Sequence, residues 1–489
     1  MSESKAKPTL LQALIPIIFL IIMLFTSVNV FGDAAIEGSN QISLLMAAAV
    51  AGLVAMRLGY SWNEMQNGMV KSISSAMAAI IILLLIGSLA GTWLLSGIVP
   101  AMIYYGLKIL NPTIFLFAAC LVSAMVSLAT GSSWSTVATL GVALLGIGKA
   151  LGMPDGIIAG AIISGAYFGD KMSPLSDTTN LAPAMTGTDL FTHIKYMTHT
   201  TFPSMGLTLV IFIIWGFTIE PGTSGNDIPQ ILAAIDKAFN INGWLFIVPV
   251  VVIFMIAKKV PAIPALLSGT LLGGIFAIIF QPNIIDQVSG ITGDLIKSSF
   301  VGVLKAMYGE ISITTDHSMV NELLSTSGMS GMLNTIWLIL TAMIFGGIMD
   351  TAGMLQRIAN EVIKFAKSTG NLIASTAVTC LFFNVTASDQ YLAIVVPGRM
   401  FAGTYKGRGL KPEVLSRTLE DSGTVTSVLV PWNTCGATQA SVLGVATGTY
   451  LPYCFFNIIS PLMTILFGYL NIKIRRFSDD PESGDNDVK

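Results

Sequence analysis

Residues 156–186 read GIIAGAIISGAYFGDKMSPLSDTTNLAPAMT, an apolar segment long enough to span a membrane but interrupted by a polar run. Lipid offers no hydrogen bonds, so non-helical backbone at membrane depth is tolerated only where protein buries it or where it lines a watery cavity. Three other apolar segments are interrupted in the same way: 113–147 around TGSSWST, 371–398 around NVTASDQ and 414–447 around PWNTCG. We interpret 113–147 and 371–398 as re-entrant hairpins, and 156–186 and 414–447 as broken helices.

The composition of the whole chain supports a membrane location. Of 489 residues, 53% are hydrophobic and 11% are Asp, Glu, Lys or Arg, whereas soluble domains carry about 25% charged residues. The mean hydropathy is +0.76. A net charge of −2 leaves no basic excess to track a nucleic-acid backbone, so a nucleic-acid partner is not expected. The four cysteines lie in apolar stretches without metal-ligand spacing and are expected to be small core residues.

Further apolar runs have the length needed to cross about 30 Å of hydrocarbon. They occur at 10–31, 41–58, 72–96, 196–219, 261–280, 333–350 and 451–471, with a shorter one starting at Gly243. Cytoplasmic loops hold more Lys and Arg than external loops, and this bias places both termini in the cytoplasm. The sequence therefore predicts an all-α polytopic membrane protein with about ten transmembrane helices plus two re-entrant hairpins, in a lipid bilayer.

The polar interruptions recur at matched positions in the two halves of the chain. Thr130 precedes Pro174 by 44 residues, and Thr386 precedes Pro431 by 45. Weak internal symmetry of this kind is typical of transporters built from inverted repeats. The expected organisation is a cytoplasmic amino terminus (1–9), a first repeat (10–219), an extracytoplasmic linker (220–242), a second repeat (243–471) and a disordered cytoplasmic tail (472–489).

Two hairpin tips and two helix breaks at matched positions are expected to meet near the midplane, where free carbonyls and helix ends can hold an ion. The breaks are rich in side-chain oxygen, the ligand that a small hard cation prefers. The candidate ligands are Ser132, Ser133, Ser176, Thr178, Thr179, Asn180, Ser388, Asn433 and Thr434. Ser and Thr can also satisfy carbonyls of their own helix or join helices, so each of these residues has a purely structural alternative.

Charged residues in the breaks are stronger candidates, because an Asp at the bilayer centre costs at least about 2.5 kcal/mol. Asp177 lies in the first break and Asp389 in the second hairpin tip, and both are expected to bind the cation or carry the proton. Asp170 and Asp421 are further candidates, with Lys171 as a charge partner. Asp170 and Lys171 could instead form a structural ion pair, and Asp421 could face the cytosol. We expect Na⁺ at Asp177, Thr178, Asn180 and Asp389.

A carboxylate that binds Na⁺ must be ionised, so a proton and the cation compete for the same group. That competition is the simplest form of Na⁺/H⁺ antiport. The chain contains no HExxH, GxSxG or P-loop pattern, and an enzyme of those classes is not expected.

Three motifs are similar to those of a known family: TGSSWSTVATLG (Thr130–Gly141), GDKMSPLSDTTNLA (Gly169–Ala182) and EDSGTVTSVLVPWNTCGA (Glu420–Ala437). Together they make the chain resemble, from about residue 10 to residue 471, the NhaC family of bacterial Na⁺/H⁺ antiporters. The resemblance implies a secondary transporter of the bacterial inner membrane with two inverted repeats and no cofactor, moving Na⁺ and H⁺. It also implies an ion site at the hairpin tips and helix breaks.

The resemblance leaves the substrate open, since the family looks to include an exchanger of malate for lactate coupled to H⁺ and Na⁺. A dicarboxylate site needs cationic donors or bare helix amino termini, whereas these breaks carry Asp177 and Asp389 and only Lys171 nearby. We therefore favour Na⁺/H⁺ exchange, for sodium extrusion and pH homeostasis, over malate/lactate exchange. A passive cation channel is an alternative of another class, and a homodimer is plausible.

Overall fold

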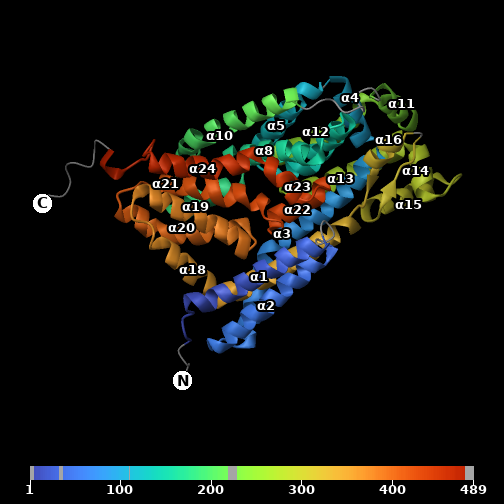
Figure 1. The fold of residues 1–489 in the computed structure, drawn as a ribbon. Coiled ribbons are helices and arrows are strands. Elements are labelled where there is room, and N and C mark those ends of the chain that lie inside the picture. The colour runs from blue at the N-terminus through green and yellow to red at the C-terminus, as the bar shows by residue number, and fades with distance from the viewer. Residues whose placement is uncertain (1–4, 32–36, 110, 219–227, 316, 480–489) are drawn as a thin grey trace.

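The computed structural model describes residues 5–31, 37–109, 111–218, 228–315 and 317–479, most of them helical (Figure 1). Among these residues, seven helices are long and apolar enough to cross a membrane: α1 (Leu10–Phe31), α2 (Ser39–Arg57), α3 (Trp62–Leu95), α5 (Pro112–Thr130), α10 (Leu190–Thr218), α13 (Ala262–Phe280) and Ser330–Thr351, which contains α17 (Leu333–Thr351). Two bent pairs raise the number to nine: α11 (Ile228–Ala238) with Gly243–Ala257, which contains α12 (Ile247–Ala257), and Thr447–Tyr453 with α24 (Phe455–Tyr469). The predicted all-α polytopic class is confirmed.

The outer surface of the bundle is apolar, as a lipid-facing surface must be. On α1, Ile18, Ile22 and Phe25 are 49%, 58% and 70% exposed. An apolar stripe of this kind is unfavourable in water, but hydrocarbon accommodates it while the helix satisfies its own backbone. The broad exposed stripes therefore support burial of these helices in a bilayer.

The interrupted segment near residue 130 folds as a helical hairpin. Its first arm is α5, and its second arm runs through α6 (Ser133–Thr136), the π-helix η2 (Val137–Gly141) and α7 (Val142–Ala150). The two arms are antiparallel, because a Cβ placed on Gly148 near the end would lie 2.8 Å from the ring of Phe115 near the beginning. The hairpin therefore enters and leaves the bundle at the same end, over nearly the range predicted.

A broken helix follows the first hairpin directly. It consists of α8 (Asp155–Met172), a non-helical break at 173–176 and α9 (Asp177–Thr186). α8 packs along α5, where the Ser127 hydroxyl donates a 2.6 Å hydrogen bond to the Ala166 carbonyl. Gly165 and Gly169 face the α5 backbone and leave no room for a Cβ. Small residues permit such close backbone contact between membrane helices.

The second half repeats this order of elements. α19 (Thr369–Thr386) and α20 (Gln390–Gly407) form the hairpin, and a broken helix follows through α21 (Pro412–Leu419), the π-helix η6 (Glu420–Thr424), η7 (Ser427–Leu429), a break at 430–433 and α22 (Thr434–Leu443). The hairpin arms are antiparallel, with the hydroxyls of Thr376 and Tyr405 3.1 Å apart. The Arg408 guanidinium also donates to the Ala366 carbonyl, which joins the two ends of this hairpin.

The two hairpins enter from opposite ends of the bundle. The open end of the first lies against α4 (Ile98–Ile109), where Gly106 faces Ile147. In Figure 1, α4 lies at the upper right, whereas α19, α20 and α21 lie toward the left, near the described carboxyl-terminal end. Counting each broken helix once and neither hairpin gives crossings by α1, α2, α3, α8–α9, α10, α12, α13, α17, α21–α22 and α24. This is the inverted arrangement expected from the sequence.

The remaining elements are short and connect the longer segments. α14 (Pro282–Ser289), α15 (Leu295–Tyr308), α16 (Ser318–Leu323), and the two-residue strands β1 (Ile311–Ser312) and β2 (Ser325–Thr326) build the long connection before α17. α18 (Met354–Ile363) lies between α17 and α19, and α23 (Thr447–Tyr450) precedes α24.

The segment after α24 is more ordered than we expected. We predicted a disordered tail from residue 472 onward, but Lys411 donates to the Arg475 carbonyl at 3.1 Å and Phe477 donates to Gly409 at 2.9 Å. These backbone hydrogen bonds hold the segment against the turn before α21. Residues 480–489 of the predicted tail, and 220–227 within the predicted linker, lie outside the described residues.

Candidate functional site

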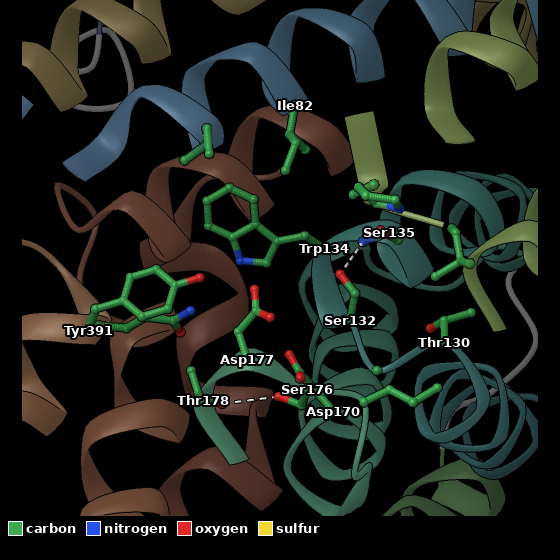
Figure 2. Close-up of a pocket in the computed structure, with 18 of the residues that line it drawn as sticks. Ile82, Thr130, Ser132, Trp134, Ser135, Asp170, Ser176, Asp177, Thr178 and Tyr391 are labelled. Carbon is green, nitrogen blue, oxygen red and sulfur yellow. Dashed lines mark hydrogen bonds between the residues drawn. The ribbon is translucent and has the colours of Figure 1, made fainter. Parts of the chain in front are cut away.

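A cavity of about 610 Å³ lies where the hairpin tips and helix breaks meet (Figure 2). Its wall includes the first hairpin tip, the first break, the start of α20 and the start of α22. The rest comes from α3 and from the loop between α12 and α13. Residues from both halves of the chain are thus brought to one polar cavity, as the matched breaks predicted.

Close packing holds the first hairpin tip against the first break. Gly131 has a φ of +70°, and a Cβ there would lie 2.6 Å from the Cβ of Leu175 and 2.9 Å from the Ser176 nitrogen. Asp170 joins the two segments, because one of its oxygens accepts hydrogen bonds from the Ser133 amide at 3.0 Å and hydroxyl at 2.6 Å. The tip therefore cannot move without disturbing the break.

The second tip is attached to the second break in a similar way. The Thr434 amide donates to the Ser388 carbonyl at 3.0 Å, and the Asn433 side chain donates to the Asn384 carbonyl at 3.0 Å. Ser388 has a φ of +59°, in the left-handed region that non-glycine residues rarely occupy. Such strain persists only where surrounding structure imposes it, and it is common at functional sites.

Two helix amino termini at the cavity are already capped by the chain itself. Asp389 accepts a 3.0 Å hydrogen bond from the Leu392 amide at the start of α20. Asn433 accepts one of 3.0 Å from the Cys435 amide at the start of α22. These caps occupy amide groups that an anionic ligand would otherwise use.

Asp177 differs from the other acidic residues of the cavity. It begins α9, its side chain is exposed to the cavity, and it makes no hydrogen bond or ion pair with any residue that the structure describes. Thr178 and Asn180 line the same wall. Asn180 is held by its amide, which donates to the Ser176 carbonyl at 2.7 Å. An unpaired carboxylate beside hydroxyl and amide groups suits a small cation.

A fully buried ion pair lies beside the cavity. Lys171, at the end of α8, pairs with Asp421 in η6, and both side chains have no exposed area. Thr200 donates to the second Asp421 oxygen at 2.8 Å, and Lys171 donates to Ser460 at 3.2 Å. The Arg417 Nε lies 4.0 Å from Asp421. This network joins both broken helices to α10 and α24.

The structure separates the predicted site residues into two groups. The cavity wall contains Ser132, Asp170, Ser176, Asp177, Thr178, Asn180, Asp389 and Thr434. Outside the wall lie Ser133, Thr179, Ser388 and Asn433, which hold the tips and breaks in place, and Asp421, which pairs with Lys171. The alternative pair between Asp170 and Lys171 does not form, because the Asp170 side chain points to the hairpin tip instead.

Sequence reasoning missed several residues of the wall. Trp134, Ser135 and Tyr391 line the cavity, and so does Lys259 from the loop between α12 and α13. Trp134 and Ser135 are part of the TGSSWST motif and Tyr391 follows Asp389 by two residues, so proximity to the breaks was the available signal. Lys259 carried no such signal, because it lies more than 70 residues from the nearest break.

A multi-pass helical bundle that brings two hairpin tips and two broken helices to one polar cavity has the architecture of a secondary membrane transporter. The model of the Na⁺/H⁺ antiporter family matches residues 165–472. The chain belongs to this family.

Curated relatives match nearly the whole chain. The Na⁺/H⁺ antiporter NhaC of Alkalihalophilus pseudofirmus is 37% identical over 89% of this chain and 91% of its own length. The malate-2H⁺/Na⁺-lactate antiporter of Bacillus subtilis is 36% identical over 94% of this chain and 95% of its own. The arginine/ornithine antiporter ArcD of Halobacterium salinarum is 35% identical over 98% of this chain and 95% of its own.

Proposed function

We propose that the protein exchanges cytoplasmic Na⁺ for external H⁺ by alternating access, and so extrudes sodium. The observation that carries the proposal is the unpaired Asp177 carboxylate in a cavity shared by both repeats. Na⁺ and H⁺ each neutralise this group, so only one of them occupies it at a time. Relatives named as Na⁺/H⁺ antiporters support the same exchange.

We place Na⁺ at Asp177, with Thr178, Asn180 and Asp389 as further oxygen ligands. All four line the cavity. Asp389 also caps α20. Cation binding at this carboxylate would therefore act directly on an arm of the second hairpin. Ion binding would thereby affect elements of both repeats.

We assign the described conformation to the state that opens to the cytoplasm. Lys259 and Pro261 line the cavity and belong to the loop between α12 and α13. The bias of Lys and Arg toward cytoplasmic loops favours the cytoplasm for this loop and for both termini. We keep as predictions that the protein lies in the inner membrane of a bacterium and that it forms a homodimer.

Malate/lactate exchange is the second candidate, because a relative with that name is 36% identical. The cavity disfavours it, since Asp170, Asp177 and Asp389 all line the wall. The caps at the starts of α20 and α22 also remove amide groups that a dicarboxylate would use.

The test uses everted membrane vesicles with an acidic interior and a pH-sensitive dye. Adding Na⁺ alone should restore fluorescence as protons leave, and Asp177→Asn should abolish the signal, because the neutral amide cannot take up and release a proton in exchange for Na⁺. Asp155→Asn is the matched control: Asp155 also lies in the first turn of its helix, but it pairs with Lys149 away from the cavity. A requirement for malate and lactate as well as Na⁺ would overturn the proposal.

A further inference from the structure

The cavity is larger than Na⁺ exchange requires. A small hard cation is held by a few oxygen ligands at close distance, whereas 610 Å³ falls within the range of about 300–1,000 Å³ typical of small-molecule sites. The part of the cavity wall that does not supply the proposed Na⁺ ligands includes two aromatic side chains. The size and chemistry of the space therefore suit a second type of ligand.

The two aromatic side chains come from the two hairpins and lie near the free carboxylate. Trp134 lies in α6 at the first tip, and Tyr391 lies in the first turn of α20. Figure 2 shows the Asp177 carboxylate next to the nitrogen edge of the Trp134 indole, with the Tyr391 hydroxyl directed toward the same space. The Trp134 indole nitrogen is buried and finds no hydrogen-bond partner in the described part of the chain. Aromatic side chains beside a carboxylate are a poor ligand set for Na⁺, but they are common in sites that bind an organic ammonium or guanidinium group.

The charge of the wall points to a cation as well. Asp170, Asp177 and Asp389 line it, and Lys259 is the one basic residue of the described lining. The Ser135 hydroxyl, on a side chain that is 1% exposed, lies in the same wall without a partner among the described residues. This hydroxyl and the indole N–H are free to bind polar atoms of an organic ligand.

We propose that this cavity also binds an organic cation with a primary ammonium or guanidinium group, which competes with Na⁺. The charged group lies at Asp177, near Trp134 and Tyr391, and the rest of the molecule occupies the space toward Ser135. The proposal rests on the proposed function in one respect only, the place of Na⁺ at Asp177.

The test measures binding and transport separately. Purified protein is titrated with radiolabelled arginine, and unlabelled ornithine, putrescine, Na⁺ and malate are added as competitors. Arginine should bind, organic cations should displace it and malate should not. Putrescine lacks a carboxylate, so its effect shows whether the ammonium group alone suffices. In proteoliposomes with a pH-sensitive dye, the same cations should raise the Na⁺ concentration needed for half-maximal exchange.

The variants Trp134→Leu and Tyr391→Leu should each weaken arginine binding by about three- to thirtyfold, the range expected for losing one cation–π contact. Trp134→Phe keeps a ring and should stay within about threefold of the natural protein. Size-exclusion chromatography and the Na⁺-driven signal show whether each variant is folded.

Each outcome decides between the two ideas. Na⁺/H⁺ exchange without binding or competition by any organic cation overturns this inference and leaves the proposed function intact. Organic-cation binding without Na⁺-driven exchange supports the inference and overturns the proposed function. Binding that is unchanged in both leucine variants places the ligand elsewhere and overturns the inference, and the absence of binding and exchange in folded protein overturns both.

Discussion

Lys171 and Asp421 neutralise each other where no water reaches them, since neither side chain has exposed area. Removing one member of a buried pair leaves the other charge uncompensated, which costs about 3–5 kcal/mol. We therefore expect Lys171→Met to lower the stability of the protein by that amount in thermal unfolding in detergent. The double variant Lys171→Met/Asp421→Leu should recover only part of the loss, because it removes both charges of this pair but leaves the buried Arg417 without the carboxylate 4.0 Å from its Nε.

An exposed ion pair provides the control for this prediction. Lys149 and Asp155 lie 3.0 Å apart, with side chains 37% and 42% exposed. Solvent screens such pairs, and their contribution is about 0–1 kcal/mol. If Lys171→Met proved no more damaging than Lys149→Met, the buried network would not be a stabilising element.

Single residues of the site were predictable where a rule applied to them individually. Asp177 was predictable because placing a carboxylate inside an apolar membrane segment costs free energy, which marks the residue as a functional candidate. The partner of Lys171 was not, because 250 residues separate it from Asp421 and sequence spacing carries no information over that distance. Trp134 and Tyr391 were missed because an aromatic residue in a membrane segment is far more often a packing residue.

The contact between hairpin and broken helix depends on the absence of a side chain at Gly131. Gly131→Ala would place a methyl group within 3 Å of Leu175 and Ser176, in addition to straining a φ of +70°. We expect this variant to raise the half-saturating Na⁺ concentration at least about tenfold, equivalent to about 1.4 kcal/mol of displaced site geometry. Dye-based exchange in everted vesicles measures it.

Gly187→Ala separates strain from crowding. Gly187 ends α9 with a φ of +82°, but nothing lies within 4 Å of its Cβ position. It carries the backbone penalty alone, and its exchange activity should stay near that of the natural protein. Equal loss in the two variants would show that backbone strain, and not contact between tip and break, causes the defect.

The elements themselves could largely be predicted, because a polar run inside an apolar segment can be resolved in few ways in lipid. The predicted hairpin at 371–398 has its turn at 387–389, between α19 and α20. The π-helices η2 and η6 could not be predicted from the sequence, because the extra residue in their turn reflects packing against neighbouring helices. The ordered segment at 473–477 was missed for a similar reason: its partners are backbone groups at 409–411, which any sequence offers.

The proposed orientation of the whole bundle can be tested with single cysteines. All four natural cysteines have no exposed area, so the natural chain gives little background. Lys259→Cys should react with a membrane-impermeant maleimide in everted vesicles but not in intact cells. Thr292→Cys, exposed in the connection before α17, should show the reverse pattern. Labelling of both from one side would refute the proposed topology.

The arrangement of the two halves followed from charge and symmetry together. Polar breaks 44 and 45 residues after matched threonines predicted repeats, and Lys and Arg counts made them inverted. What these signals could not provide was the cavity's shape, because α3 and the loop at Lys259 contribute to its wall without any polar break of their own.

The buried pair also has a consequence for how the chain is made. Lys171 enters the bilayer 250 residues ahead of Asp421, which at about 5–20 residues per second is a wait of about 12 to 50 s. A lone lysine at the membrane centre costs about 3 kcal/mol during that time. The first repeat is thus a metastable biosynthetic intermediate, and pulse-chase should show a chain truncated before Asp421 being degraded faster than one truncated after the second repeat.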